Sequence, residues 1–225
     1  MKKKLLSLAI MAMAATLAQA QAQPGKLSLK PMVGVTVSTL SDADVDLDAL
    51  LGIPGAGTIE ALPKVGFVIG GEVEWQANPV LALSAGLTYS TLGCRFDEFG
   101  IHQGSERIGA KDIKLSLNYL NIPIMANFYV AKGLALKVGL QPQILTKAKE
   151  QMTVYAESGG MYGSVDLSED DLNTNDFALS LPIGMSYEVK GVVFDARYAF
   201  GLTDVYDDSH NKCSSFQFTV GYRFN

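Results

Sequence analysis

Apolar and polar residues alternate along most of this chain with a period of two. In the last ten residues, 216–225, Phe216, Phe218, Val220, Tyr222 and Phe224 alternate with polar or small residues. The same alternation occurs in residues 26–40, 64–75, 80–94, 119–130, 134–147, 177–189 and 192–202. A period of two is the signature of a β-strand with two different environments on its faces. The pattern therefore predicts eight strands, each with one apolar and one polar face.

The connections between these strands alternate between short and long. Turn residues form three short connections, at residues 77–79, 131–133 and 190–191, and the other four, at about residues 41–63, 97–113, 155–176 and 206–212, are longer. This arrangement predicts an all-β fold, an eight-stranded antiparallel up-and-down transmembrane β-barrel with short periplasmic turns and long extracellular loops. We expect the last strand to pair with the first, because an unpaired sheet edge cannot be hydrated in lipid.

A secreted β-sandwich or a soluble lipocalin-like barrel is the alternative. Such a fold hides its apolar face and exposes its charged face. In this chain the polar face combines charges with many Gly and Ser residues, which suits a narrow, filled interior. The apolar face has almost no charge and places aromatic residues near strand ends, as in a membrane girdle. These aromatic residues are Trp75, Tyr89, Phe128, Tyr187, Phe200 and Tyr222.

The N-terminus has the features of a secretory signal peptide. Three lysines, Lys2 to Lys4, precede an apolar run over residues 5–17 and the small-residue pattern Ala18-Gln19-Ala20. We expect a signal peptide over residues 1–22, cleaved near residue 20 or 22, and a barrel over residues 23–225. The apolar run is shorter than the roughly 20 residues that a membrane-spanning helix needs. The sequence therefore predicts an integral protein of the bacterial outer membrane.

The charge distribution limits the partners. The formal net charge is −5, and the segments 41–63 and 155–176 are rich in Asp and Glu. An acidic protein does not suit nucleic acid, whose phosphates need a basic surface. Acidic extracellular loops also repel heparin and similar anions. We expect outer-membrane lipid and lipopolysaccharide as partners, and no nucleic acid.

Two segments carry a resemblance to a known family. The segment YLNIPIMANFYV, followed by a turn and LALKVGLQPQILTKAKE, together with the closing aromatic strand, resembles the PorT-type outer-membrane β-barrel domains of Bacteroidetes. The resemblance implies a barrel over essentially the whole mature chain. The name-giving member acts in protein secretion across the outer membrane. By resemblance, the partners would then include other envelope or secretion proteins.

The polar face predicts a filled, non-conducting lumen. Side chains about fill the interior of an eight-stranded barrel, and charges that are walled off from water must be paired. We therefore expect a buried salt-bridge network with the two arginines of strands seven and eight as its hubs, since a guanidinium can bind several carboxylates. By alternation, the lumen receives Lys30, Glu72, Glu74, Lys137, Glu188, Asp195, Arg197 and Arg223.

Some residues interrupt the expected strands. Pro31, Pro123, Pro142 and Pro182 lie inside them and cannot donate to a ladder. Leu115 and Leu117 are out of phase with Leu120, which indicates a β-bulge nearby.

Catalytic and metal sites receive little support. A lipid hydrolase or acyltransferase would need a nucleophile, a histidine and a carboxylate. The histidines, His102 and His210, fall in expected loops near Ser105, Ser209 and Ser214, residue types that any solvated loop contains. We expect no enzymatic activity and no cofactor.

The acidic segment DADVDLDAL, residues 42–50, is the only candidate for a metal site. It lacks the glycine and the later bidentate glutamate of a calcium loop. Weak calcium binding remains a hypothesis. The alternation of this segment favours instead an extension of the first strand above the membrane, so we expect no metal site.

By the alternation along their strands, the side chains of Cys94 and Cys213 both point toward the lumen, at the rim with the long loops. Their strands are not neighbours, and a disulfide needs Cα atoms within about 7 Å. A bridge between them is a hypothesis that requires the loops to fold over the mouth.

Overall fold

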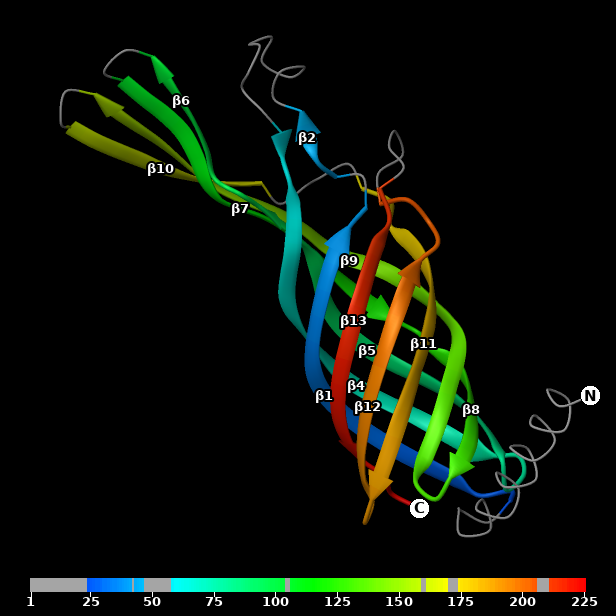
Figure 1. The fold of residues 1–225 in the computed structure, drawn as a ribbon. Helices are drawn as coiled ribbons and strands as arrows, with labels where there is room; N and C mark the ends of the chain where they lie inside the picture. The colour runs from blue at the N-terminus through cyan, green and yellow to red at the C-terminus, as the bar shows by residue number, and fades with distance from the viewer. Residues whose placement is uncertain are drawn as a thin grey trace, which may run out of the picture.

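Pairing between the first and last strands closes the sheet of this protein into a barrel (Figure 1). In the computed structural model, β1 (Leu27–Leu40) pairs antiparallel with β13 (Cys213–Tyr222). On its other edge, β1 pairs with β4 (Ala61–Gln76), which pairs with β5 (Leu81–Phe96). The predicted closure is therefore confirmed.

The remaining strands complete the ring. β5 pairs with both β7 (Glu106–Asn121) and β8 (Ile124–Ala131). These two segments form one strand of the barrel wall, interrupted at Pro123; we call each complete strand of the wall a stave. Both halves pair with β9 (Leu134–Ser158), and the ring continues through β11 (Phe177–Val189) and β12 (Val192–Gly201) to β13. With β7 and β8 counted together, the barrel has eight antiparallel staves, as predicted.

The structure describes residues 24–41, 43–46, 58–103, 106–158, 161–169, 174–205 and 211–225. The expected signal peptide, residues 1–22, lies outside these ranges and stays a prediction. No helix in the described ranges is long and apolar enough to cross a bilayer.

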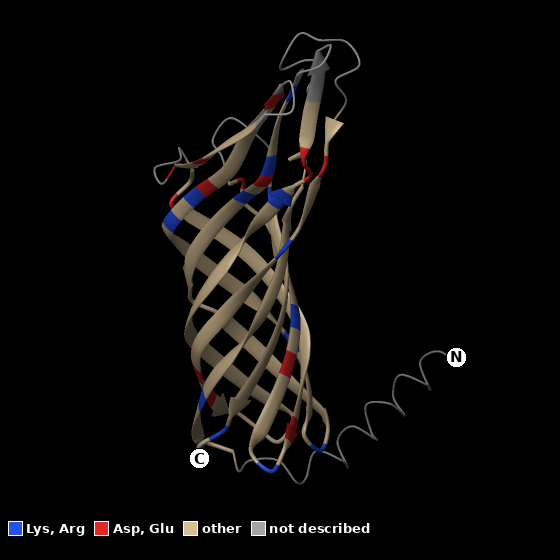
Figure 2. Cartoon of the chain, turned by 90° about the vertical axis from the view of Figure 1, so that its left-hand side faces the viewer, with Lys and Arg blue, Asp and Glu red and all other residues tan. Residues whose placement is uncertain are grey.

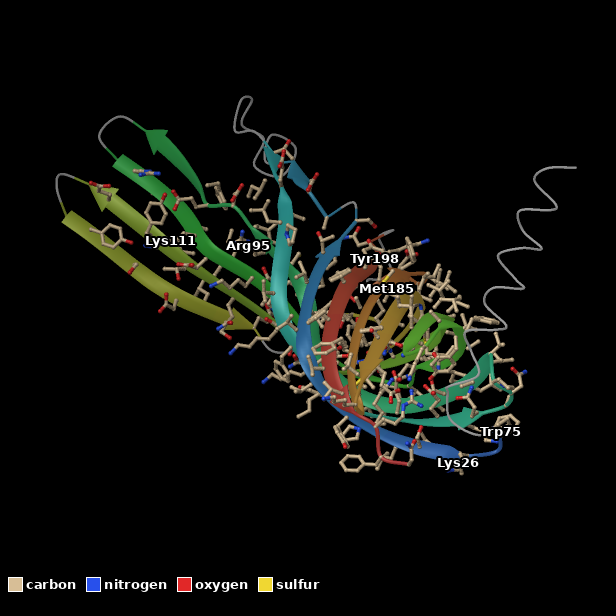
Figure 3. All side chains as sticks on the ribbon, turned by 60° about the horizontal axis from the view of Figure 1, so that its bottom comes forward. Lys26, Trp75, Arg95, Lys111, Met185 and Tyr198 are labelled. Carbon is tan, nitrogen blue, oxygen red and sulfur yellow. The ribbon has the colours of Figure 1, made fainter. Side chains whose placement is uncertain are left out.

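Side-chain exposure alternates along the staves with the predicted parity. On β13, Phe216, Phe218 and Val220 are exposed, whereas Gln217 and Thr219 are buried. The apolar face therefore points outward and the polar face inward, the reverse of a soluble barrel. Trp75 and Lys26 lie near the end with the short turns, which is the periplasmic end in proteins of this architecture (Figure 3).

Two of the expected long loops are mostly strands. β6 (Phe99–Gln103) pairs with the outer part of β7, and β10 (Met161–Glu169) pairs with the outer part of β9. Because β7 and β9 also pair there, the four strands form a sheet, β6-β7-β9-β10, that projects beyond the barrel (Figure 1). We call it the extracellular sheet. The loop prediction for residues 97–113 and 155–176 was wrong, because strands outside lipid mix polar and apolar residues on both faces.

A β-bulge lies where the extracellular sheet leaves the barrel. Asn118 pairs with Lys147 but Tyr119 pairs with Leu145, so Thr146 is an extra residue in β9. The sequence predicted a bulge near here from Leu115 and Leu117, and β7 does have a second register shift between Lys111 and Lys114, although these leucines are not themselves the extra residues. Those two leucines share the inward parity of Tyr119 and are buried.

The acidic segment after β1 also differs from expectation. β1 ends at Leu40, and β2 (Val45–Asp46) pairs with β3 (Thr58–Ile59) in a small separate ladder. The segment therefore does not extend the first strand, contrary to the prediction. Asp42 and Asp48 lie outside the described residues.

Candidate functional site

The half of the lumen nearer the short turns, which we call the lower half, contains a cluster of five charged residues, each at least 98% buried. Glu72 accepts at both oxygens: Lys30 Nζ lies 2.7 Å from Oε2, and Arg197 Nη2 lies 2.8 Å from Oε1. Lys137 Nζ lies 3.4 Å from Glu72 Oε2 and 2.5 Å from Asp195 Oδ2. Arg197 Nε donates to Asp195 Oδ1 at 2.8 Å. We call these residues the Glu72 cluster.

A second cluster lies nearer the periplasmic rim, around Arg223. Its Nη1 donates to Glu74 Oε1 at 2.7 Å and its Nη2 to the Tyr129 hydroxyl at 2.8 Å. Tyr129 donates to Glu74 Oε1 at 2.5 Å, and Asn127 Nδ2 donates to Glu74 Oε2 at 3.0 Å. Arg223 Nε lies 2.8 Å from Glu188 Oε2, an ion pair without hydrogen-bond alignment. We call this group the Arg223 cluster.

The structure thus brings the eight charged residues predicted for the lumen into two groups. The Glu72 cluster holds three bases and two acids, and the Arg223 cluster holds one base and two acids, so the groups compensate each other. Glu188 is the most exposed member, with 23% of its side chain accessible. Sequence reasoning missed Tyr129 and Asn127, although their parity places both inward.

Above these charges the interior holds buried polar side chains such as Ser90, Asn121 and Gln217, and then an apolar cluster into which Lys64 reaches, with its Nζ donating to Leu115 O at 3.2 Å. A cluster of buried side chains spans several staves near the extracellular end. It contains Leu40, Ala43, Leu92, Cys94, Leu115, Leu117, Tyr119, Ala148, Ala178 and Val205. Cys213 packs against it. We call it the upper apolar cluster; alternation along the strands did not predict it.

The two cysteines are free. Cys94 is buried and Cys213 is half-buried, in and beside the same apolar cluster. The structure forms no bond between them, so the disulfide stays a hypothesis; both side chains lie inward, as the alternation predicts.

Aromatic and basic side chains gather on one face of the extracellular sheet. Arg107 lies 5.5 Å from the Tyr155 ring centroid, and Lys111 Nζ lies 5.9 Å from that centroid and 5.6 Å from that of Tyr162. The Tyr155 and Tyr162 rings stack at 6.2 Å. A hydrogen bond from Lys111 Nζ to the Tyr162 hydroxyl, at 3.1 Å, raises the pKa of Lys111. Added methyl groups at Gly100 or Gly109 would meet the Tyr155 hydroxyl, so these glycines make room for the ring.

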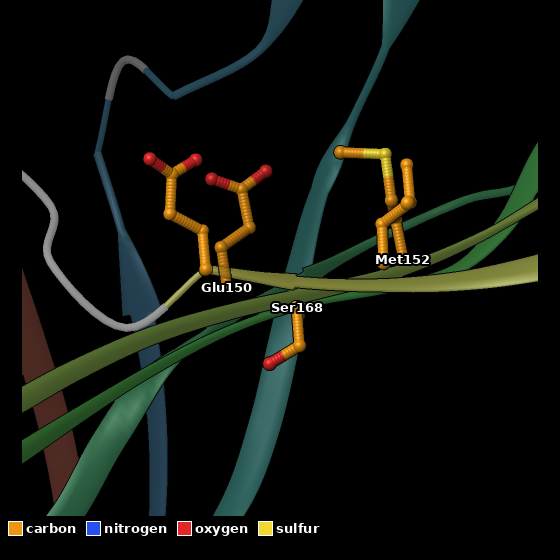
Figure 4. Close-up of a pocket in the computed structure, with 5 residues that line it drawn as sticks. Glu150, Met152 and Ser168 are labelled. Carbon is orange, nitrogen blue, oxygen red and sulfur yellow. The ribbon is translucent and has the colours of Figure 1, made fainter.

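A shallow depression of about 410 Å³ lies at the base of this sheet (Figure 4). Glu150 and Glu169, which pair across β9 and β10, line it together with Met152, Leu167 and Ser168. Two carboxylates alone do not make a metal site. In the part of the chain that the structure describes, no group of three or more His, Cys, Asp or Glu could hold a metal ion.

The residues considered for catalysis are not brought together among the described residues. His102 lies in β6 and Ser214 in β13, where its hydroxyl accepts from Gly201 N at 3.2 Å. Ser105, Ser209 and His210 lie outside the described residues.

Comparison with known proteins identifies the family. The model of the family described as "Outer membrane protein beta-barrel domain" matches residues 19–207. The chain belongs to this family. Like other outer membrane β-barrel domain proteins, it is therefore an integral protein of the outer membrane. No curated protein matches the chain.

Solved barrels of the outer membrane are similar in fold to this β-barrel domain. The attachment invasion locus protein Ail of Yersinia pestis is 13% identical, with a TM-score of 0.43, covering 90% of this chain and 100% of Ail. Neisserial surface protein A is 14% identical, with a TM-score of 0.42 and coverage of 87% and 95%. OprG of Pseudomonas aeruginosa is 11% identical, with a TM-score of 0.38 and coverage of 91% and 98%.

Proposed function

We propose that this protein is a non-conducting outer-membrane anchor that presents an extracellular interaction surface. The observation that carries the proposal is the combination of the Glu72 cluster with the upper apolar cluster in one lumen. An ion crossing the barrel would have to break buried ion pairs and then pass packed apolar side chains, beside which the Lys64 ammonium lies. Both steps are costly, because an ion that leaves water needs charged or polar partners to replace its hydration.

The interaction surface is the extracellular sheet. β6 pairs with β7 and β10 with β9, which leaves the outer edge of each strand available for hydrogen bonding. Ile108, Val165 and Leu167 are exposed on this sheet, 56%, 62% and 49% respectively, although it stands clear of the membrane. Exposed apolar side chains beside strand edges favour protein binding. The described parts of the acidic segments, residues 43–46, 58–63, 155–158 and 161–169, belong to the same extracellular end.

Membership of the PorT-type branch, and a place in a secretion machine, are the alternative form of this proposal. They rest on the resemblance of residues 119–150 and of the closing strand. Both forms describe a binding protein without enzymatic activity. They differ only in whether the partner is a secretion component.

Conductance in planar lipid bilayers tests the closed lumen. We expect the purified protein to insert without producing current steps, because its lumen is filled. The double variant Leu117→Gly with Tyr119→Gly removes two large side chains from the upper apolar cluster. Current through this variant would show that the barrel inserts in the assay and that the bilayer reports leakage through its lumen. Regular open-channel steps from the parent protein would refute the proposal.

A photo-crosslinkable residue at Val165 tests the interaction surface in whole cells. The matched control carries the same residue at Val33, an exposed apolar position on the outward face of β1. We expect protein adducts from position 165 and lipid adducts from position 33. Secretion proteins among the adducts would favour the secretion form, and an absence of protein adducts at position 165 would contradict both forms.

A further inference from the structure

The barrel wall folds inward near its extracellular end, so that β1 meets β5 inside the lumen. In sheet order, β4 lies between these two strands. Strands two places apart in a sheet are separated by roughly 10 Å. Here, however, the Thr36 hydroxyl of β1 donates to Thr91 O of β5 at 2.8 Å, and the Ser38 hydroxyl donates to Gly93 O at 2.9 Å. These bonds require the wall to be sharply folded at this level.

The intervening strand, β4, has little bulk at the fold. Its pairing with β5 is interrupted by a register shift between Pro63 and Val68. Within this interval, a Cβ atom added at Gly66 would collide with Thr91 O and the Thr36 hydroxyl. The missing side chain and the irregular pairing therefore allow β1 to reach β5.

The fold also brings β13 to β5. Both β1 and β4 lie between these strands in the sheet, but residues of β13 and β5 have Cα atoms within 8 Å of each other. The approach includes the extracellular end, because Cys213 packs against the upper apolar cluster that contains Cys94. A hydrogen bond also joins the Cys213 side chain to the backbone of Gly93. The two cysteines therefore meet through the folded wall, and no loop has to cover the mouth.

A lysine ammonium lies beside both thiols. Lys64 Nζ donates to Leu115 O at 3.2 Å and to the Ser116 hydroxyl at 2.5 Å, and it interacts electrostatically with the sulfurs of Cys94 and Cys213. The thiolate is the form of cysteine that attacks a disulfide. Burial disfavours a thiolate and a neighbouring lysine favours it, so Lys64 is placed to assist thiol chemistry at this pair.

The pair lies at the end of the barrel where an oxidant can arrive. Arg95, the residue after Cys94, lies where the extracellular sheet leaves the barrel (Figure 3), and charged residues gather at that end of the barrel (Figure 2). Cys213 is half-buried whereas Cys94 is fully buried, so the sulfur of Cys213 is the one that an oxidant reaches first. An outer-membrane protein lies outside the reducing cytoplasm, where disulfides form and persist.

We propose that Cys94 and Cys213 form a disulfide that joins β5 to β13 across the lumen. The Cys213 thiolate attacks the disulfide of an oxidant, such as a thiol–disulfide oxidase of the cell envelope, and one oxidant sulfur leaves as a thiolate. The Cys94 thiolate then attacks the Cys213 sulfur of the mixed disulfide, and the other oxidant sulfur leaves. The chain loses two protons and two electrons, and the oxidant becomes a dithiol.

The bond fixes the folded wall at the extracellular end of the barrel. It closes a loop of about 120 residues, from position 94 to position 213. A crosslink over so long a loop restricts the unfolded chain and therefore stabilises the fold. The oxidised protein should then resist unfolding better than the reduced protein.

Intact mass after thiol alkylation tests the bond. Protein exported to the outer membrane is extracted in detergent with excess maleimide, denatured with the maleimide still present, and weighed without reductant. We expect no added maleimide and a mass lower by two hydrogen atoms than that of the reduced chain. After reduction in denaturant, two maleimides should add, and the unreduced single variant Cys94→Ala should add one. Two maleimides on the exported parent before reduction would overturn the proposal.

The matched control moves one thiol down the same face of β13, in the double variant Cys213→Ala, Thr219→Cys. Thr219 is also buried in the lumen, but it lies six residues below Cys213, about 20 Å along the strand. We expect this control to add two maleimides before reduction, because its thiols cannot meet. A bond within the control, or a parent bond that links two chains on a non-reducing gel, would contradict the proposed geometry.

Urea unfolding with and without reductant measures the effect of the bond. We expect reductant to shift the parent's midpoint to lower urea concentration and to leave the midpoint of the control variant unchanged, since only the parent has a crosslink to lose. Both proteins should keep the heat-dependent gel shift of a folded barrel. A parent midpoint that does not respond to reductant would overturn the stabilising role of the bond.

Discussion

Glu72 contacts more cations than any other acid of the Glu72 cluster. Lys30, Lys137 and Arg197 all reach its two oxygens, whereas Asp195 meets only Lys137 and Arg197. Because these side chains are almost fully buried, each of the cations depends on a carboxylate to replace its hydration. The cluster is therefore a set of mutually dependent charges, and the loss of any member leaves another uncompensated.

Replacing Arg197 by alanine tests this dependence. The substitution removes a donor from both Glu72 and Asp195, so we expect the free energy of unfolding to fall by about 3 to 5 kcal/mol. The measurement is urea unfolding in detergent or lipid, followed by the heat-dependent gel shift. Lys114→Ala is the control, since its exposed pair with Asp112 contributes less than about 1 kcal/mol. An unchanged midpoint for Arg197→Ala would mean that this guanidinium does not lie in a packed lumen.

A charge-compensating pair of substitutions separates electrostatics from packing. Glu72→Gln leaves Lys30, Lys137 and Arg197 with Asp195 as the one acid of the cluster, and we expect a loss of about 3 to 5 kcal/mol. Adding Lys30→Met removes the cation whose ion pair is with Glu72 alone, so part of the stability should return. The same unfolding assay measures both variants. Additive losses in the double variant would contradict charge coupling between the two positions.

Alternation was sufficient to predict which charged side chains lie in the lumen, but not which of them meet. Parity depends only on position along one strand. Contacts such as Glu72 with Lys137, from β4 and β9, depend on the stagger between staves that are not adjacent in the sheet. That stagger is a property of the closed barrel. For the same reason the sequence could not show that Tyr129 would lie between Glu74 and Arg223.

At the scale of single elements, β9 combines three environments in 25 residues. Its lower part is a lipid-facing stave, its middle carries the bulge at Thr146, and its upper part belongs to the extracellular sheet. The sequence predicted the lower part, because lipid enforces alternation there. It did not predict the upper part, because pairing with β7 and β10 outside lipid leaves no strict alternation.

Deleting Thr146 tests the role of the bulge. The deletion would turn Lys147 and Lys149 toward the upper apolar cluster, where an unpaired ammonium costs several kcal/mol. We expect a loss of more than about 4 kcal/mol in unfolding free energy, or protease cleavage of upper β9 in an otherwise folded barrel. Thr146→Ala keeps the extra residue and loses only the hydroxyl's hydrogen bond to Asn118 O, so we expect about 1 kcal/mol. Similar effects of the two changes would contradict a register role for the bulge.

At the scale of the whole molecule, the barrel and the extracellular sheet are held by different interactions. Ring closure, the lumen charges and the upper apolar cluster lie within the staves. The outer half of the sheet adds the contacts of Arg107, Lys111, Tyr155 and Tyr162. The barrel therefore has what it needs to fold without the outer half of the sheet.

Excising the outer half of the sheet tests this independence. Phe99 pairs with Ala110, Ala110 with Val154, and Val154 with Val165, so one row crosses all four strands. Replacing residues 100–109 and 155–164 each by Asn-Gly, a two-residue hairpin turn, closes both hairpins at this row. We expect the shortened protein to keep the gel shift and its unfolding midpoint, while protein adducts at position 165 disappear. A shortened protein that fails to fold would show that the sheet supports the barrel, and the anchor and the interaction surface would then be one unit.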